Sequence, residues 1–334
     1  MKRVSTTLRT DSTHDLLHQA RSALWLLLWI SLYSNSTQAT NCLYVSSYHH
    51  GYEWNDGIER GIEEVLTDKC TLDKYFMDTK RNNNEPFIEK SALAAKAYIE
   101  QTRPDIVIAC DDNASKYLIK PHYRDAKLPI VFCGINWTVE EYGYPYRNVT
   151  GMIEVAPILP LLKVIRNILG ETSQGLYLSA DNETERKDFE RYRKIYANEG
   201  VELKSTFVTS LEAWKKAFIK AQSFAFVILN NNSGINDWDV AAATSFVRQN
   251  TRALTVTNYD WMIPYSMIAM TKLPEEQGSW AAQVALAILA GERPRDIPIV
   301  VNRRWNIYIN PKLLDSSPYK LPASLKQKAI AKEQ

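Results

Sequence analysis

The sequence predicts an α/β fold made of two units, each a parallel sheet covered by helices on both faces. Near-continuous apolar runs such as 105–110 and 224–229 are typical of strands that are buried on both faces. These runs alternate with segments of helical apolar spacing, which is the order of a βαβ fold. The alternation occurs twice, and no low-complexity linker separates the two cycles. We therefore expect two Rossmann-like lobes that meet along a cleft.

The first cycle opens with a short strand at 43–45, a polar loop and a helix over 54–67. Pro86 then opens a second helix, and Pro104 marks its end because proline is tolerated only at a helix start. The other strands expected in this cycle are 72–77, 105–110 and 129–133.

The second cycle begins after Gly151. Asn182 and Glu185 have the spacing of a capping box, which predicts a helix start there. Segment 264–269 is predicted to cross between the units. The helices expected are 157–169, 182–199, 211–222, 238–250 and 279–290, and the strands are 174–179, 201–208, 224–229, 253–257 and 305–309.

The charge of the chain argues against a nucleic-acid partner. The formal net charge is +2, from 40 basic and 38 acidic residues. Four bases and two acids lie in the first 39 residues, so the rest of the chain has 36 of each and is neutral. Phosphate binding normally needs a basic excess or patch.

The N-terminus has the order of a secretory signal peptide. Basic residues precede an apolar run at 23–30, and the small residues Thr37 and Ala39 follow it. The apolar run is too short to span a bilayer comfortably. We expect residues 1–39 to be a cleaved signal peptide and the mature protein to be periplasmic; an uncleaved anchor is the alternative.

The four cysteines would then lie in an oxidising compartment. Cys42 precedes the first strand and Cys70 the next, so neighbouring strand starts would bring them within bridging range. We predict a disulfide between them. Cys110 and Cys133 each end a predicted strand and are expected to be small buried hydrophobic residues.

Polar and aromatic residues follow nearly every predicted strand, which is the layout of a ligand site in a cleft. The first loop contains Ser46, Tyr48, His49 and Trp54, and such a loop is suited to a small, partly flat molecule. Trp137, Tyr259 and Trp261 lie on loops rather than at helical spacing, which favours stacking on a ligand.

Metal binding and catalysis are not expected. The His49-His50 pair with Glu53 has a spacing that would suit a metal. A third ligand is missing from the local pattern, however, and His122 is the one histidine that remains elsewhere in the mature chain. Asp111 and Asp112 are more typical of helix caps, or of one Asp that contacts a ligand ammonium, than of acid–base chemistry. The chain has no dinucleotide fingerprint, Walker loop or nucleophile elbow. We therefore predict a binder without cofactor or metal rather than an enzyme.

The chain resembles ABC-transporter substrate-binding proteins of the periplasmic-binding-protein type 1 fold, in the branch that includes aromatic amino acid binders. The resemblance covers about 41–330 and lies in the order of several segments rather than in one motif. Segment 46–58 also resembles extracytoplasmic sensor domains of bacterial signalling proteins. The matching segments are 104–136 with Leu-Pro-Ile-Val-Phe-Cys-Gly, 148–152, 289–294 and 306–313.

This resemblance implies two lobes joined by a three-strand hinge and closing on a small molecule. Lobe 1 would comprise 41–154 and 268–292, and lobe 2 would comprise 155–267 and 293–334. Asp112 or Asp260 would hold an ammonium group, and the helix start at Asn182 and Thr184 would suit a carboxylate. The resemblance carries ligand contacts onto Ser46, Tyr48, Asp112, Asn136, Asn182, Asn232 and Asp260.

The leading hypothesis is a monomeric solute-binding protein that delivers an amino-acid-like or polar–aromatic ligand to an ABC permease. The alternative is a sensory binder that docks, when loaded, on a membrane signalling receptor. An exported α/β enzyme is a more distant alternative.

The targeting segment provides a first test. We expect cleavage after Ala39, which would give a mature chain that begins Thr40-Asn41-Cys42. The intact mass of the exported protein measures this directly. A mass that still includes the apolar run 23–30 would contradict the prediction.

Overall fold

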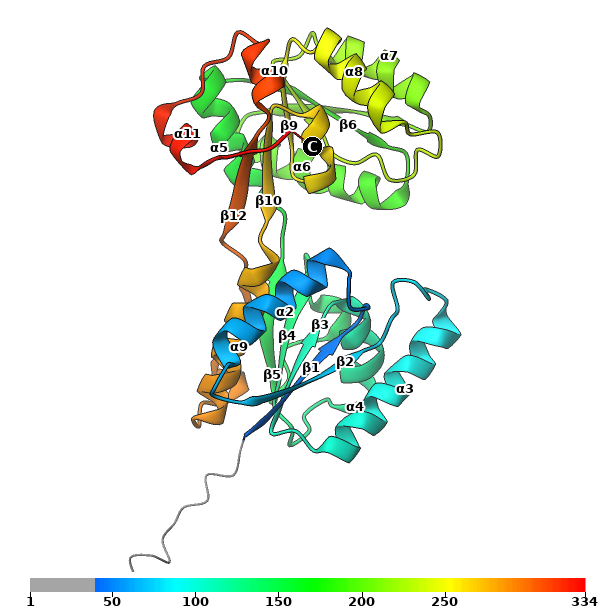
Figure 1. The fold of residues 1–334 in the computed structure, drawn as a ribbon, viewed down its shortest axis with the longest axis vertical. Coiled ribbons are helices and arrows are strands. Elements are labelled where there is room, and N and C mark those ends of the chain that lie inside the picture. The colour runs from blue at the N-terminus through cyan, green and yellow to red at the C-terminus, as the bar shows by residue number, and fades with distance from the viewer. Residues whose placement is uncertain (1–39, 334) are drawn as a thin grey trace, which may run out of the picture. The chain divides into compact units, whose positions relative to one another are not determined.

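The structure is a computed structural model, and it describes residues 40–333 (Figure 1). The predicted signal peptide, residues 1–39, lies outside the described residues. Among the helices of the described part, none combines the length and the apolar character that a membrane crossing requires. Two sheets of mostly parallel strands are present, which confirms the predicted α/β fold.

The first sheet has the strand order β11-β5-β4-β3-β1-β2, and all its pairs are parallel. The order places β1 inside the sheet, as in doubly wound folds. Its strands are β1 (Asn41–Ser46), β2 (Thr71–Phe76), β3 (Ile106–Cys110), β4 (Ile130–Asn136), β5 (Val149–Glu154) and β11 (Val300–Val301). Its helices are α2 (Glu53–Leu66), α3 (Glu85–Thr102), η1 (Ala114–Ile119), α4 (Lys120–His122), η2 (Glu140–Tyr142), α9 (Pro274–Leu289) and η4 (Pro294–Asp296).

Separate apolar clusters fill the two faces of this sheet, because successive strand residues point to opposite sides. Tyr44 and Ile108 belong to the cluster that α2 and α9 cover. Leu43 and Val107, their neighbours in sequence, belong to the cluster on the other face, which α3 and η1 cover. Figure 1 shows α2 and α9 together on one side of the sheet and α3 on the other.

The helices α2 and α9 contact each other through glycines. A Cβ added at Gly278 would lie 1.9 Å from the carbonyl oxygen of Ile58, and one added at Gly61 would lie 2.3 Å from that of Glu275. Both distances are far inside van der Waals contact. The two backbones therefore touch directly, and only glycine fits at these positions.

The second sheet has the order β13-β12-β10-β9-β8-β6-β7, with β10 and β12 antiparallel and the other pairs parallel. One large apolar cluster packs around it, with the fully buried Trp214 among its members. Its strands are β6 (Gln174–Ala180), β7 (Glu202–Val208), β8 (Phe226–Leu229), β9 (Leu254–Thr257), β10 (Ile268–Lys272), β12 (Trp305–Ile309) and β13 (Ile330–Ala331). Its helices are α5 (Ile158–Leu169), α6 (Glu183–Asn198), α7 (Leu211–Ala221), α8 (Val240–Asn250), η3 (Asp260–Tyr265), α10 (Pro311–Asp315) and α11 (Ala323–Lys328).

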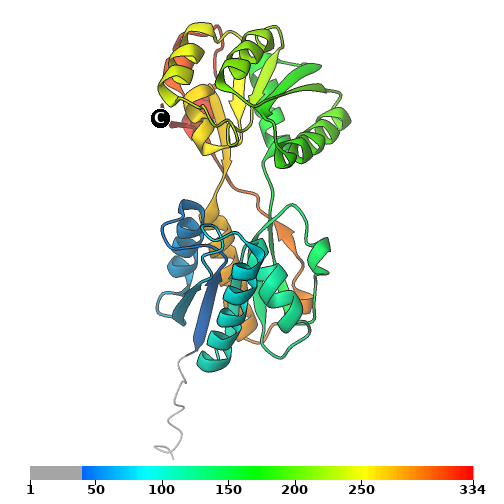
Figure 2. The ribbon, with the colours of Figure 1, turned by 90° about the vertical axis from the view of Figure 1, so that its right-hand side faces the viewer.

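The chain passes between the two sheets three times, from β5 to α5, from β10 to α9 and from β11 to β12 (Figure 2). Side chains hold these segments to one another. The Asn302 amide bonds both backbone groups of Val155, and the Glu276 carboxylate accepts from the backbone N–H groups of Arg303 and Arg304 at 2.8 Å each. The three connections form the hinge that the fold class implies.

The sheets differ from the predicted lobe boundaries at two segments. β10 pairs within the second sheet, whereas 268–292 was expected in the first lobe, and β11 pairs within the first sheet, whereas 293–334 was expected in the second. The crossing also lies after β10, near Leu273, rather than at 264–269. The sequence did not predict these two assignments because the local residues of a strand do not indicate which of the two sheets it joins.

Both cysteine pairs form disulfides. Cys42 and Cys70 are joined, as expected from neighbouring strand starts. Cys110 and Cys133 are also joined, which corrects the expectation of two separate buried thiols. They face each other because β3 and β4 pair in register, with Cys110 opposite Cys133. The sequence placed each at a strand end but did not reveal that these strands are neighbours.

The contact between α2 and α9 predicts the effect of Gly278→Ala. A methyl group there would meet backbone atoms that cannot rotate away. We expect the free energy of unfolding to fall by about 1–3 kcal/mol through overpacking, although alanine favours a helix by about 1 kcal/mol. Urea unfolding measures it, with Ser245→Ala on the exposed face of α8 as the control. A Gly278→Ala variant as stable as the control would contradict the close contact.

Candidate functional site

Two adjoining cavities lie at the carboxyl ends of the strands of both sheets. The first, which we call the tyrosine cavity, has a volume of about 240 Å³ and is lined by Tyr48 and Tyr52 among others. The second, the arginine cavity, has a volume of about 530 Å³ and is lined by Arg191. We call the two together the central cleft. Both are lined by Asn136, Glu154, Asn258, Tyr259 and Lys272.

Asp111 is the most buried of the acidic residues that line the tyrosine cavity. It follows β3 directly with φ +74°, a left-handed conformation that turns the chain away from the strand. Its Oδ2 accepts a hydrogen bond of 2.7 Å from the Asn55 amide, which also donates to Ser46 Oγ at 2.6 Å. Burial, followed by the nearby negative charges of Glu154 and Asp112, raises the pKa of Asp111 well above its ordinary value. The tyrosine cavity thus contains a buried carboxyl group whose negative charge is only partly compensated.

Asp112 lies beside Asp111 and lines the arginine cavity. Tyr142 donates to its Oδ1 at 2.7 Å, and the Asn136 amide donates to its Oδ2 at 3.0 Å. The helix cap expected from the sequence is not formed: residue 113 precedes η1, without a capping side-chain bond. The Asp112 carboxylate is therefore oriented by two neutral donors at the edge of the cleft.

An ion pair between Glu154 and Lys272 separates the two cavities. Burial raises the pKa of the Glu154 carboxyl, and the Lys272 ammonium opposes this rise. The same ammonium lies 5.1 Å from the centre of the Trp54 ring. Glu154 ends β5 and Lys272 ends β10, so the pair joins two of the three hinge connections.

Aromatic rings line the tyrosine cavity from both sides. Tyr48 and Tyr52 pack edge to face, and Lys80 Nζ lies 5.1 Å and 4.9 Å from their ring centres. From the second sheet, Tyr259 and Trp261 stack with centres 4.4 Å apart. Trp261 is 52% exposed, which is unusual for so large a ring. Tyr259 is partly buried. A stacked pair at a cavity with one ring exposed is well suited to a planar ligand group.

In the arginine cavity, Trp137 also has a left-handed backbone, with φ +66°. This conformation is rare for a bulky residue, and such residues are concentrated at functional sites. The Arg191 guanidinium lies 4.5 Å from the centre of the Trp137 ring and pairs with Asp188 at 2.7 Å. Desolvation raises the pKa of Asp188, and Arg191 opposes that shift.

Glu185 organises the strand ends of the second sheet. It is fully buried. Its Oε2 accepts hydrogen bonds from Tyr177, Ser179 and Asn230, and its Oε1 accepts one from Asn231. Asn231 Oδ1 in turn accepts from the Trp261 indole at 3.2 Å. Only half of the predicted capping box exists, because Asn182 caps the helix while Glu185 turns inward.

The model of one family matches residues 49–332 of the chain, and its description is ABC transporter substrate binding protein. The chain belongs to this family. The match confirms the resemblance noted in the sequence, and it includes every residue that lines the central cleft except Tyr48. It establishes a solute-binding role, and the partners that the family implies are a small-molecule ligand and a membrane transporter or sensor.

Solved structures share the fold of this substrate-binding protein at low sequence identity. A ligand-free, open substrate-binding protein with adhesive properties from Clostridium difficile is 13% identical, with a TM-score of 0.69 over 89% of this chain and 100% of that one. A domain from Streptococcus pneumonia in complex with L-Trp is 15% identical, with a TM-score of 0.55 over 87% and 99%. A conserved domain protein from Vibrio cholerae is 15% identical, with a TM-score of 0.57 over 88% and 99%. A comparison with curated proteins found no match.

Most residues that the sequence proposed for ligand contact in this substrate-binding protein lie at the central cleft. Four others do not line either cavity. Ser46 is buried beneath Asn55, His49 bonds the carbonyl of His50, Asn182 caps α6, and Asn232 lies in the turn after β8. Those that line the cleft are Tyr48, Trp54, Asp112, Asn136, Trp137, Thr184, Asp260 and Trp261.

The structure adds cleft residues that the sequence analysis did not propose as ligand contacts. Thr184, Asp188 and Arg191 are spaced i, i+4 and i+7, so the helical period of α6 was a usable signal that these side chains share a face. Glu154 had no such signal, because β5 was not recognised as a strand. The added lining residues are Tyr52, Lys80, Asp111, Glu141, Glu154, Ala156, Lys187, Asp188, Arg191, Tyr192, Asn258, Thr271 and Lys272.

Asp111→Asn tests the buried carboxyl. Because the folded-state pKa is raised, the native protein loses stability as the pH rises above the ordinary carboxyl pKa of about 3.9. The Asp111→Asn variant, measured without ligand, has no carboxyl group at this position and does not lose stability in this way. We expect it to be more stable than wild type by about 0.5–2 kcal/mol at pH 7, a typical gain when function costs stability, with the gain shrinking toward pH 4.

Urea unfolding at both pH values measures this difference. Asp315→Asn, at an exposed position on α10, removes the same charge from the surface and is the control. If Asp111→Asn is less stable than wild type by the same free energy at both pH values, the charge of Asp111 is not under-compensated and the prediction is wrong.

Proposed function

We propose that the protein is an exported, monomeric solute-binding protein that delivers an amino-acid-like ligand with a planar side group to an ABC importer. The ligand would bind in the central cleft, between the carboxyl ends of the two sheets. The observation that carries this proposal is that one cavity is lined both by the buried Asp111 carboxyl and by the stacked rings of Tyr259 and Trp261.

Asp111 and Asp112 favour a cationic group on the ligand. Asp111 is buried and its pKa is raised by desolvation, and Asp112 is held ready by two neutral donors. An ammonium group placed between them would supply the missing positive charge. A charge-assisted hydrogen bond in such a desolvated position is among the stronger polar contacts that a protein makes.

The carboxylate of an amino acid would bind in the arginine cavity. Thr184 lies in the first turn of α6, where unpaired backbone N–H groups favour an anion. Lys187 and Arg191 line the same cavity one and two turns further along the helix. A zwitterion that lies between Asp112 and the start of α6 would satisfy both charges.

The aromatic rings favour a planar group. Tyr259 and Trp261 from the second sheet and Tyr48 and Tyr52 from the first line the same cavity. Closure of the hinge over a flat group would bury its faces against rings from both sheets. A ligand that contacts both walls binds the closed form more strongly, and so shifts the protein toward that form.

The first experiment identifies the ligand and then removes one contact. Mass spectrometry after mild denaturation identifies what co-purifies, and calorimetric titration with amino acids measures affinity. If Asp112 contacts the ligand ammonium, Asp112→Ala should weaken binding by roughly thirtyfold or more, which corresponds to losing about 2–5 kcal/mol. Asp315→Ala, at an exposed position away from the cleft, should bind as wild type does.

Thermal melting beside the titration separates a contact from a structural role. A lower melting temperature with unchanged affinity would remove Asp112 from the ligand site. Failure of all amino acids to bind, with an anionic or neutral solute found instead, would overturn the ligand class. Recovery of a signalling receptor rather than a permease from membranes would favour the sensory alternative.

A further inference from the structure

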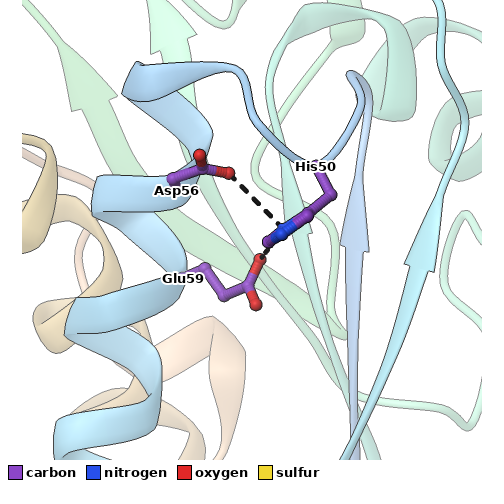
Figure 3. A group of neighbouring side chains, drawn as sticks. All are labelled: His50, Asp56 and Glu59. Carbon is purple, nitrogen blue, oxygen red and sulfur yellow. Dashed lines mark ion pairs between the residues drawn. The ribbon is translucent and has the colours of Figure 1, made fainter.

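A second cluster of polar side chains lies on the first lobe, outside the central cleft. It consists of His50 from the loop before α2, and Asp56 and Glu59 from α2 (Figure 3). One ligand atom from each residue lies within 4.8 Å of the others. None of the three is among the residues that line the tyrosine or arginine cavity. The cluster is therefore unexplained by solute binding.

The separations in this cluster are too long for hydrogen bonds. His50 Nδ1 lies 3.7 Å from Asp56 Oδ1 and 3.8 Å from Glu59 Oε2. Two donor atoms bound to one tetrahedral metal ion at about 2.1 Å lie about 3.4 Å apart. Figure 3 shows the imidazole pointing toward both carboxylates. Because the side chain of His50 is 75% exposed, a small adjustment toward such a geometry meets little resistance.

Glu59 provides an independent indication of a missing ligand. The residue is 8% exposed, and its Oε2, the atom that faces His50, is buried without a hydrogen-bond partner. A buried carboxylate oxygen without a partner is costly. The other oxygen, Oε1, bonds Lys74 at 2.5 Å, which fixes the side chain with Oε2 directed at the cluster.

The local charge favours a dication. Lys74 is shared between Glu59 and Glu63, so one positive charge serves two carboxylates. Asp56 adds a third negative charge. With His50 neutral, as a metal ligand must be, these four charged groups leave a net charge of −2. A bound divalent ion would neutralise it.

The donor set indicates the kind of ion. One imidazole nitrogen with two carboxylate oxygens suits zinc and similar first-row divalent metals, whereas calcium and magnesium prefer oxygen ligands alone. Asp56 Oδ1 also accepts the backbone N–H of Gly51 at 2.9 Å, which orients it as supporting bonds orient metal ligands. Open positions on the exposed side would be filled by water.

We propose that His50, Asp56 and Glu59 form a binding site for a divalent transition metal ion such as Zn²⁺. This replaces the expectation of no metal site. The sequence analysis paired His49 and His50 with Glu53, whereas the structure places Asp56 and Glu59 of α2 beside His50. A bound ion would tie the loop to α2, and this loop also carries Tyr48 and Tyr52 into the tyrosine cavity.

Calorimetric titration of the tag-free protein with Zn²⁺ alone tests the site. We expect saturable binding of one ion and a higher melting temperature with zinc, because an ion that binds only the folded state stabilises it. His50→Ala and Glu59→Gln should each weaken binding at least tenfold, the lower end of what even supporting residues cost. His122→Ala, which removes another exposed histidine, should bind as wild type does.

Cobalt as a second probe reports coordination directly, because its visible absorption depends on the ligand set. The absorption should appear with wild type and His122→Ala and be lost with His50→Ala. No saturable zinc binding by wild type would overturn the proposal. Unchanged affinity in either His50→Ala or Glu59→Gln would do the same, since it would place any bound zinc elsewhere. Neither result depends on the identity of the solute.

Discussion

The direct backbone contact between α2 and α9 is the constraint on which the site depends. α2 begins immediately after the loop that lines the tyrosine cavity, and its Asn55 holds the buried Asp111. α9 begins at Pro274, two residues after Lys272, at the second hinge connection. Because Gly61 and Gly278 allow the two helices to touch, the loop and the hinge are positioned against each other by backbone atoms. Larger residues would separate them and move both.

Three of the buried carboxyl groups, those of Glu185, Glu154 and Asp111, are compensated in three different ways, and the difference indicates their roles. Glu185 accepts four hydrogen bonds from neutral side chains and so orders the strand ends of the second sheet. Glu154 is paired with Lys272 at the hinge. Asp111 has the neutral amide of Asn55 and a pKa raised by burial. A group that is fully satisfied serves the fold, whereas one that is under-compensated in a cavity indicates a ligand.

The loop between β1 and α2 has two differently equipped sides. Its tyrosines, Tyr48 and Tyr52, line the cleft, while His50 lies against the carboxylates of α2. The chain turns between Tyr48 and Tyr52, with Gly51 at φ +88°, so one short segment serves both clusters. His50 lies two positions from Tyr48 and two from Tyr52 in the sequence. Binding of a metal ion at His50 would therefore act on the backbone segment that carries both cavity rings.

Sequence pattern by itself determined the α/β class and most helix and strand positions, because apolar periodicity depends on neighbours a few residues away. It also placed Tyr48, Asp112 and Trp261 at strand ends, where parallel strands gather their loops. Tertiary structure decided which distant segments became neighbours. Three contacts join residues that are close only once the strand order is set: the Cys110–Cys133 disulfide, the Glu154–Lys272 ion pair and the Asn230–Glu185 hydrogen bond. Strand order is a property of the whole packed sheet, and no local pattern encodes it.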